Sequence, residues 1–124
     1  TRLIGIGFPS TLTKIESEAF SGCSGLKYIN IPSSVTEIKE RAFFYCTNIL
    51  VINIDEGLKK IGLNVFAYCT SLETIIIPKS VEEIESSFIG CENLIIHCRS
   101  NVIPSTWSRD WSSNHSYILG YTGD

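Results

Sequence analysis

The side chains with the most reactive chemistry in this sequence are five cysteines and two histidines. Four of the cysteines recur at intervals of 23, 23 and 22 residues, as Cys23, Cys46, Cys69 and Cys91. If the chain repeats one structural unit at this period, the Cα atoms of neighbouring cysteines lie about 5 Å apart on stacked units, a separation that a disulfide tolerates. Equivalent side chains point the same way, however, and cysteine packs well as a small apolar residue. We therefore expect a ladder of buried thiols, with one or more disulfides as the alternative, and we expect Cys98 to lie in the core.

A metal site or a catalytic site would need such groups to converge. Zinc takes four ligands, commonly from closely spaced cysteine pairs, and the sequence has no such pair. The segment from Cys91 to Cys98 adds His97, but His97 and Cys98 face opposite sides if they lie on a strand. A nucleophile needs a histidine base within reach, and we expect His97 to face solvent and His115 to be solvated. The sequence thus predicts no catalytic residue, no metal and no cofactor.

The elements that position these groups follow from an apolar pattern with the same period. Three further columns recur every 22 or 23 residues: Phe20, Phe43, Phe66 and Phe88; Ile15, Ile38, Ile61 and Ile84; Leu12, Val35, Leu58 and Val81. A repeat of this length is typical of a solenoid, in which each unit buries its apolar face against its neighbours. Function is therefore expected on a surface rather than in a pocket.

Each unit contains a short run of alternating apolar residues, such as Leu26-Lys-Tyr-Ile-Asn-Ile31. Alternation with β-branched residues predicts a strand. About five strands are expected, at 3–8, 26–31, 49–54, 72–77 and 94–98. At this period they must stack in parallel, about 4.8 Å apart, and form a sheet along one side of the coil. The return half of each unit, such as 37–43, is expected to form a 3₁₀ turn or a single helical turn.

One unit shows the full repeat pattern, as Cys23, Leu26, Ile29, Ile31, Pro32, Ser34, Val35, Ile38, Ala42 and Phe43. This pattern resembles the BspA-type leucine-rich repeat, which is also described as Treponema pallidum-type. The resemblance covers about residues 3 to 99, with three further copies of the pattern. The copies depart from it where Val65 replaces the alanine, where Asp55 replaces the proline, and where one residue is lost between Ile84 and Phe88.

The resemblance implies a leucine-rich repeat solenoid, an α/β-type horseshoe with the parallel sheet on its concave side and short turns and loops on its convex side. It also implies a surface-exposed or secreted protein of bacteria or some protozoan parasites. Several such proteins are linked to adhesion to host matrix proteins or to other microbes. A protein partner is therefore expected, with host matrix proteins such as fibronectin and fibrinogen as candidates. A structural spacer that carries another domain and an intracellular scaffold are the alternatives.

Two regions are expected, with repeats over residues 1–99 and a C-terminal capping segment over 100–124. Residues 3–8 would form an open apolar edge strand, so the sequence is expected to be the C-terminal fragment of a longer protein. Trp107 and Trp111 are four residues apart, as on one face of a short helix. Similar tryptophan-containing tails close many bacterial members of the family, which implies a cap, while a sugar- or protein-binding platform is the alternative. Residues 116–119 could add a last strand.

The strand residues that alternate away from the core form the candidate binding face on the concave side. Tyrosine is a residue type that makes binding hot spots. The propensity of Tyr, Val and Ile for strands would also place them here, and Asn30 and Asn53 could instead form an amide ladder. The candidate face comprises Tyr28, Asn30, Val51, Asn53, Asp55, Thr74, Ile76, His97 and Arg99.

Composition narrows the partners further. The 124 residues carry a net charge of −3 and no basic cluster, which argues against nucleic acid. No apolar run approaches the roughly 20 residues that a membrane helix needs, so we expect no membrane insertion within this sequence. We expect a monomer that acts as a non-enzymatic protein-interaction or adhesion module.

Overall fold

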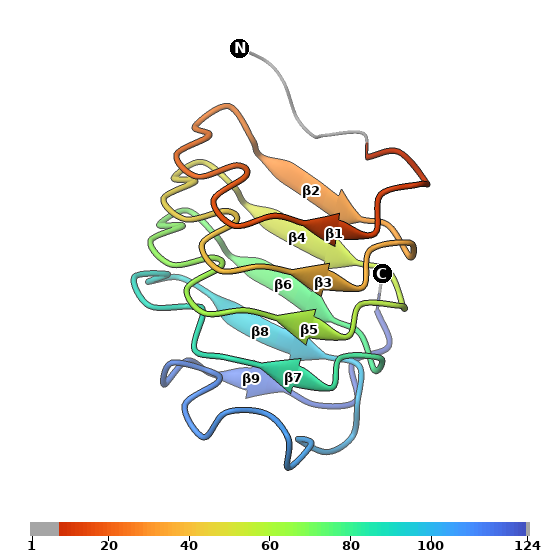
Figure 1. Cartoon of the computed structure of the whole chain (residues 1–124). Helices are drawn as coiled ribbons and strands as arrows, with labels where there is room; N and C mark the ends of the chain where they lie inside the picture. Colours follow the sequence, from red (N-terminus) through yellow and green to blue (C-terminus); the bar gives the residue numbers. More distant parts are fainter. Residues whose placement is uncertain (1–7, 124) are drawn as a thin grey trace.

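In the computed structural model, which describes residues 8–123, the chain winds into a stack of coils with a parallel β-sheet along each of two sides (Figure 1). The longer sheet has the order β2-β4-β6-β8-β9, with β2 Tyr28–Ile31, β4 Val51–Ile54, β6 Thr74–Ile77, β8 Ile95–Cys98 and β9 Tyr117–Ile118. The shorter sheet has the order β1-β3-β5-β7, with β1 Lys14–Ile15, β3 Glu37–Ile38, β5 Lys60–Ile61 and β7 Glu83–Ile84. The chain is thus a parallel-strand solenoid, as the repeat period predicts.

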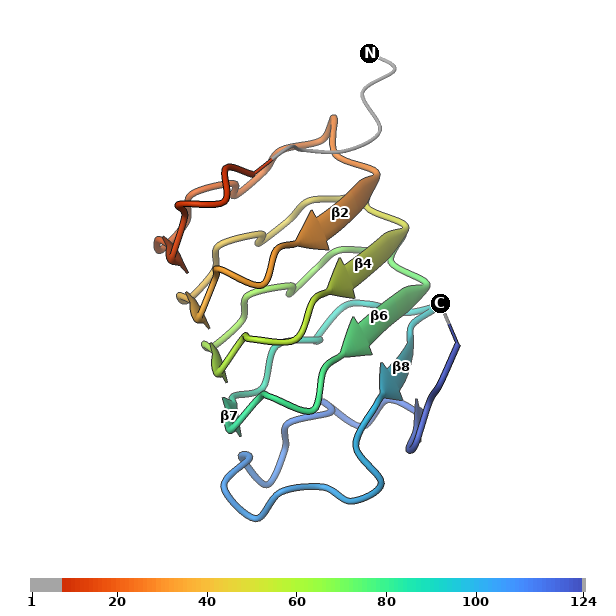
Figure 2. The same cartoon turned by 90° about the vertical axis from the view of Figure 1, so that its right-hand side faces the viewer.

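Four of the expected strands are confirmed as β2, β4, β6 and β8, which Figure 2 shows one below another. They pair in register, so that Ile29, Ile52, Ile75 and Ile96 stand in one inward-facing column. The expected strand at 3–8 falls outside the described residues except for Phe8. The fifth strand of the sheet is β9, which lies within the last strand considered at 116–119.

The return side of each coil differs from the prediction. No helix or 3₁₀ segment occurs among residues 8–123, so the expected helical turn at 37–43 is wrong. Instead, two residues of each coil form a strand of the shorter sheet, and each strand points one isoleucine into the core: Ile15, Ile38, Ile61 and Ile84. A strand of two residues needs only one inward apolar side chain, which is why a segment this polar can form it.

The backbone hydrogen bonds explain why the following turn is not helical. A 3₁₀ helix requires every amide to bond the carbonyl three residues earlier. Here Ala42, Phe44 and Cys46 do so, whereas Arg41, Phe43 and Tyr45, which alternate with them, donate to carbonyls of the next coil. In addition, Arg41 and Tyr45 have φ near +60°, which a right-handed helix does not allow. The turns therefore link neighbouring coils as the sheets do.

The core is a set of stacked columns between the two sheets. The phenylalanine rings lie nearly parallel, with successive centroids 5.3, 5.7 and 6.0 Å apart along Phe20, Phe43, Phe66 and Phe88. Such offset aromatic pairs contribute about 0.5–1.5 kcal/mol each beyond their burial. The repeat columns thus stabilise the fold by contacts between adjacent coils.

We number the coils by the strands they contain, with β1 in the first, β2 and β3 in the second, β4 and β5 in the third, and β6 and β7 in the fourth. The fourth coil is one residue shorter than the second and third, and a buried serine compensates. The backbone hydrogen bonds between the third and fourth coils align Ser87 with Val65. The fourth coil therefore lacks a counterpart of Asn64, a residue with a φ of 57° in the third coil. The Ser87 hydroxyl donates to the Gly62 carbonyl at 2.6 Å and accepts from the Val65 amide at 3.3 Å. Because these groups are satisfied, the shorter coil keeps its place in the stack.

The C-terminal residues fold against the last coil. Trp107 and Trp111 are buried, and their indole rings meet edge to face with centroids 4.7 Å apart. They lie in consecutive turns closed by Trp107 N–H to Pro104 O and Trp111 N–H to Ser108 O, so the expected short helix is absent. Both indoles are thus part of the hydrophobic core and do not form an exposed ligand platform.

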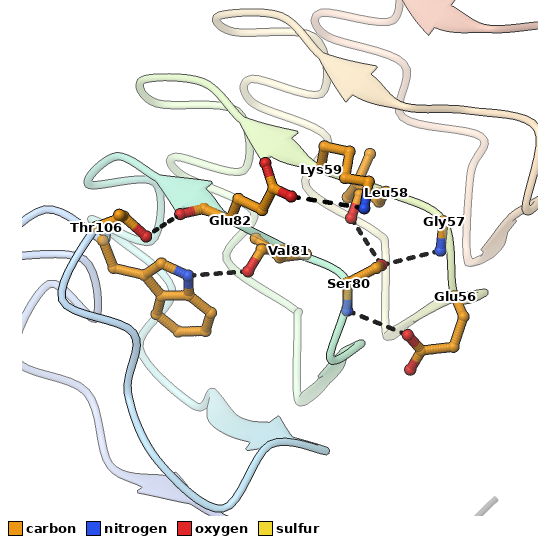
Figure 3. Close-up of polar contacts among 9 residues, drawn as sticks. Glu56, Gly57, Leu58, Lys59, Ser80, Val81, Glu82 and Thr106 are labelled. Atoms are coloured by element: carbon orange, nitrogen blue, oxygen red, sulfur yellow. Dashed lines mark hydrogen bonds and ion pairs between the residues drawn. The ribbon is translucent and has the colours of Figure 1, made fainter.

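Side-chain hydrogen bonds attach this segment to the fourth coil (Figure 3). Thr106 Oγ1 donates to the main-chain carbonyl of Glu82, and Trp107 Nε1 donates to that of Val81 at 3.2 Å. The Ser80 hydroxyl, in the same coil, donates to a carbonyl of the third coil. The C-terminal segment is therefore joined to the repeats through the same kind of contact that joins the repeats to one another.

Candidate protein-binding surface

The most regular exposed surface lies on the outer face of the longer sheet. Tyr28, Val51, Thr74 and Ile95 stand in register on four successive strands, and we call them the outer row. Tyr28 and Ile95 are 47% and 46% exposed at its two ends, while Val51 and Thr74 are half-buried between them. The outer row is thus a narrow strip of apolar and amphipathic side chains on a rigid support.

A polar strip runs beside the outer row. Asn53 Nδ2 donates to Asn30 Oδ1, and Asn30 Nδ2 donates to Asp55 Oδ2 at 3.4 Å. The amide ladder considered from the sequence is therefore present, and these side chains partly satisfy one another. Asn30 is exposed, whereas Asn53 and Asp55 are half-buried.

The far end of the predicted face is covered. Ile76 is only 3% exposed, so its place on an exposed face is wrong; it lies in register between Asn53 and His97. His97 does not simply face solvent, because its ring meets that of Tyr121 with centroids 4.6 Å apart. Arg99 lies over the same tyrosine ring at 5.6 Å and donates to its carbonyl oxygen at 3.3 Å. The C-terminal tail thus occupies this end of the face.

The cysteine column forms the expected ladder of buried thiols. All five cysteines are free, and Cys23 is half-buried while the other four are buried. Each thiol of Cys46, Cys69 and Cys91 donates to the carbonyl of a column phenylalanine in the preceding coil, at 3.0 to 3.2 Å. Because the side chains align along the stack, each sulfur faces a carbonyl oxygen.

Burial also sets the ionisation of these thiols. Loss of solvent raises the pKa of Cys46, Cys91 and Cys98 from an ordinary 9.0 to about 11. The pKa of Cys69 is raised as well, first by burial and then by the neighbouring thiols. A nucleophilic thiolate is therefore disfavoured at these four positions at neutral pH.

His115 also differs from its expected solvated position. Its Nε2 lies 2.7 Å from the carbonyl oxygen of Cys91, and its Nδ1 lies 3.0 Å from that of Ser112. The ring therefore ties the C-terminal segment to the fourth coil. Within residues 8–123, no three His, Cys, Asp or Glu residues are grouped so as to hold a metal ion, and no helix is present that could cross a membrane.

Sequence reasoning missed an aromatic cluster on the turns. Tyr45 and Tyr68 stack with centroids 5.1 Å apart, and Phe44 contacts both rings edge to face. A signal was present, because the residue before each column cysteine is either glycine or tyrosine: Gly22, Tyr45, Tyr68 and Gly90. A position that holds only glycine or tyrosine indicates either a backbone conformation that favours glycine or an exposed side chain with a role of its own.

Comparison with known proteins identifies the repeat. The model of the BspA type leucine rich repeat region matches residues 1–106 in six copies. This chain belongs to the BspA-type leucine-rich repeat family. The BspA-type pattern recognised in the sequence is thereby confirmed, and no curated protein matches the chain.

Two solved leucine-rich repeat structures share the fold. A leucine rich cell surface protein from Faecalibacterium prausnitzii is 26% identical, with a TM-score of 0.55, and the match covers 97% of this chain and 36% of that one. The T. pallidum leucine rich repeat protein is 25% identical, with a TM-score of 0.50, over 78% of this chain and 59% of that one. This BspA-type chain therefore spans roughly a third of the first relative and under two thirds of the second.

Proposed function

We propose that this BspA-type solenoid is a non-enzymatic protein-interaction module and that the outer row contacts its partner. The observation that carries the proposal is the exposed, in-register strip of Tyr28, Val51, Thr74 and Ile95. Parallel strands fix these side chains before a partner arrives, so little conformational entropy is lost on binding. Tyr28 at the exposed end has the chemistry of a binding hot spot.

A surface location and an adhesive role follow as part of the same proposal. One similar structure is that of a leucine rich cell surface protein, which supports a surface-exposed or secreted bacterial protein. Host matrix proteins such as fibronectin and fibrinogen are the first partners to test. The module acts as a monomer, because the outer row stays free for the partner.

The test is direct binding of the purified chain to immobilised fibronectin and fibrinogen by surface plasmon resonance. Saturable binding is expected, and the double variant Tyr28→Ala/Thr74→Ala is expected to lose at least tenfold in affinity. Val102→Ala is the matched control, because Val102 is the most exposed large apolar side chain described and is in none of the strands of the longer sheet. His97 is left intact because it packs on Tyr121.

The thermal midpoint of each variant is measured alongside. Exposed and half-buried changes of this kind shift stability by roughly 0.5 kcal/mol or less. Loss of affinity with an unchanged midpoint supports the outer row as the contact. Absence of binding to both matrix proteins would favour the structural spacer, and equal binding by the double variant would move the contact elsewhere.

A further inference from the structure

The turn edge of the solenoid carries an exposed aromatic cluster that the outer row does not explain. Tyr45 and Tyr68 stack at an interplanar angle of 20°, and Tyr45 is 51% exposed. Phe44 packs edge-on against both rings, and the exposed side chain of Ile89 lies on the next turn, where the Ile89 carbonyl accepts a hydrogen bond from the Tyr68 amide. We call Phe44, Tyr45, Tyr68 and Ile89 the aromatic edge.

The backbone beneath the two tyrosines is strained. Tyr45 and Tyr68 have φ of 60° and 61°, a region where an aromatic L-residue is unfavourable and glycine is not. The same column has glycine in the neighbouring coils, at Gly22 with φ of 75° and Gly90 with φ of 82°. Glycine thus suits this turn, and the two tyrosines are retained for what their side chains do.

The tyrosine stack is closed at one end and open at the other. A Cβ added to Gly90 would lie 2.5 Å from Cδ1 of Tyr68, so that end of the stack rests on the fourth coil. Among the residues that the structure describes, a Cβ added to Gly22 would meet no atom within 4 Å. Space therefore remains beside Tyr45 on the side of the first coil, where a further flat ring can stack.

The charges around the aromatic edge indicate what kind of partner fits. No charged residue occurs between Lys60 and Glu73 in the third coil. In the second coil, the Arg41 guanidinium lies 5.9 Å from the Phe44 ring and pairs with Glu18 and Glu40 at 4.0 and 3.6 Å. Interface cores between proteins are similarly depleted of unpaired charge and enriched in Tyr, Phe and Arg. An aliphatic neighbour favours an apolar partner over a sugar, which needs converging polar groups.

We propose that the aromatic edge is a second docking surface, which takes an uncharged segment of a partner protein and stacks one of its proline or aromatic rings on Tyr45. The aromatic edge is separate from the outer row, so this proposal can be tested independently of the function proposed above.

The probe is a phage library of random dodecapeptides selected against the whole chain. Enriched peptides are expected to be uncharged and to contain proline or an aromatic residue. Each is synthesised and its affinity measured by fluorescence anisotropy. The double variant Tyr45→Asn/Tyr68→Asn is expected to bind at least tenfold more weakly, while Tyr28→Ala/Thr74→Ala is expected to bind within twofold of wild type. Asparagine is chosen because it tolerates positive φ.

Urea denaturation provides the second readout. The midpoint of Tyr45→Asn/Tyr68→Asn is expected to equal or exceed that of wild type, because strain is relieved; a clear decrease would show that the tyrosines are structural and would overturn the proposal. Should that variant fail to fold, Ile89→Ser is measured in its place, with the same tenfold loss expected. The proposal is also overturned if no peptide is enriched, if the peptides are charged, or if the substituted edge binds them as well as wild type. Binding to a glycan array that these substitutions abolish would replace the protein partner with a sugar.

Discussion

The indole nitrogen of Trp107 donates a hydrogen bond to the main-chain carbonyl of Val81 across 3.2 Å, at a position where the indole is 7% exposed. A residue 26 positions away along the chain thereby closes the fourth coil. Trp111 and the ring of Tyr117 continue the same aromatic contact toward β9. The last repeat is thus covered by aromatic side chains where its core would otherwise end.

Replacement of Trp107 tests this cap. Trp107→Ala is expected to lower the free energy of unfolding by about 3–5 kcal/mol, because it removes a large buried side chain. Trp107→Phe keeps an aromatic ring but leaves the Val81 carbonyl without its donor, and an intermediate loss of about 1–3 kcal/mol is expected. Urea denaturation followed by circular dichroism measures both. A loss below about 1 kcal/mol for Trp107→Ala would contradict the capping role.

The buried thiols predict a loss of stability in alkali. The thiols of Cys46 and Cys91 ionise near pH 9.0 when unfolded, but their pKa is about 11 in the folded chain. The contribution of these buried, protonated thiols to the free energy of unfolding is fully present below pH 9.0 and is lost as the pH rises toward about 11. The loss is at most about 1.4 kcal/mol per thiol and pH unit. The free energy of unfolding of wild type is therefore expected to fall more steeply above about pH 9 than that of Cys46→Ala/Cys91→Ala. Parallel curves for the two proteins would refute this assignment.

A second thiol measurement needs no substitution. Titration with Ellman's reagent in denaturant is expected to detect all five thiols. In the folded chain only the half-buried Cys23 is expected to react readily, because the other four are buried and protonated. Fast reaction of more than one thiol in the folded state would contradict the burial described above.

Two glycines of one column offer a matched test of the turn. Gly90→Ala is expected to cost about 1–3 kcal/mol, because the backbone is left-handed and the new methyl group meets the Tyr68 ring. Gly22→Ala has similar backbone strain but open space around it, so a smaller loss is expected. Adding Tyr68→Asn to Gly90→Ala removes the ring that the new methyl group meets, so the double variant is expected to regain part of the stability that Gly90→Ala loses relative to Gly22→Ala. Equal costs for Gly90→Ala and Gly22→Ala would show that the Tyr68 contact does not matter.

The shorter sheet carries a column of alternating charge. Lys14, Glu37, Lys60 and Glu83 stand in register, with ion pairs of 3.8 Å in the first and last steps. Lys60→Glu would place three carboxylates side by side, and a loss of about 1 kcal/mol is expected at low ionic strength. Added salt should shrink the loss, since exposed charges are screened. Lys27→Glu is the control, because Lys27 is exposed and forms no ion pair among the described residues. An equal and salt-independent loss of stability in Lys27→Glu would argue against a role for the charged column.

The sequence predicts those parts of this molecule that repeat. Columns such as Phe43 and Ile38 mark the buried face directly, and the alternation around Ile29 marks the strands of the longer sheet. The turn at Arg41 to Tyr45 was not predictable in the same way, because its amides bond the next coil and local propensity does not report such contacts. A segment too short for a full helix and too polar for a buried strand indicates a helical turn, and the contacts with the next coil override that indication.

The site was predictable only where the repeat continues undisturbed. Tyr28 and Thr74 lie where their spacing places them. The contact of Tyr121 with His97 depends on how a non-repeating tail folds back, and no period announces it. The stacking of Tyr45 on Tyr68 depends on an uncommon backbone conformation, which a residue pattern reveals only through the glycines of the same column.

The bonding of the turns also determines how the solenoid bears load. At each boundary between neighbouring coils, the hydrogen bonds of both sheets and of the turns run along the axis of the stack. A tension applied along this axis stretches all of these bonds at a boundary together, so they share the force. A sideways pull on one end instead loads the terminal coil first and peels the coils away one at a time, as expected when each unit contacts only its neighbours. The force at which the stack unravels is therefore expected to depend on the direction in which it is pulled.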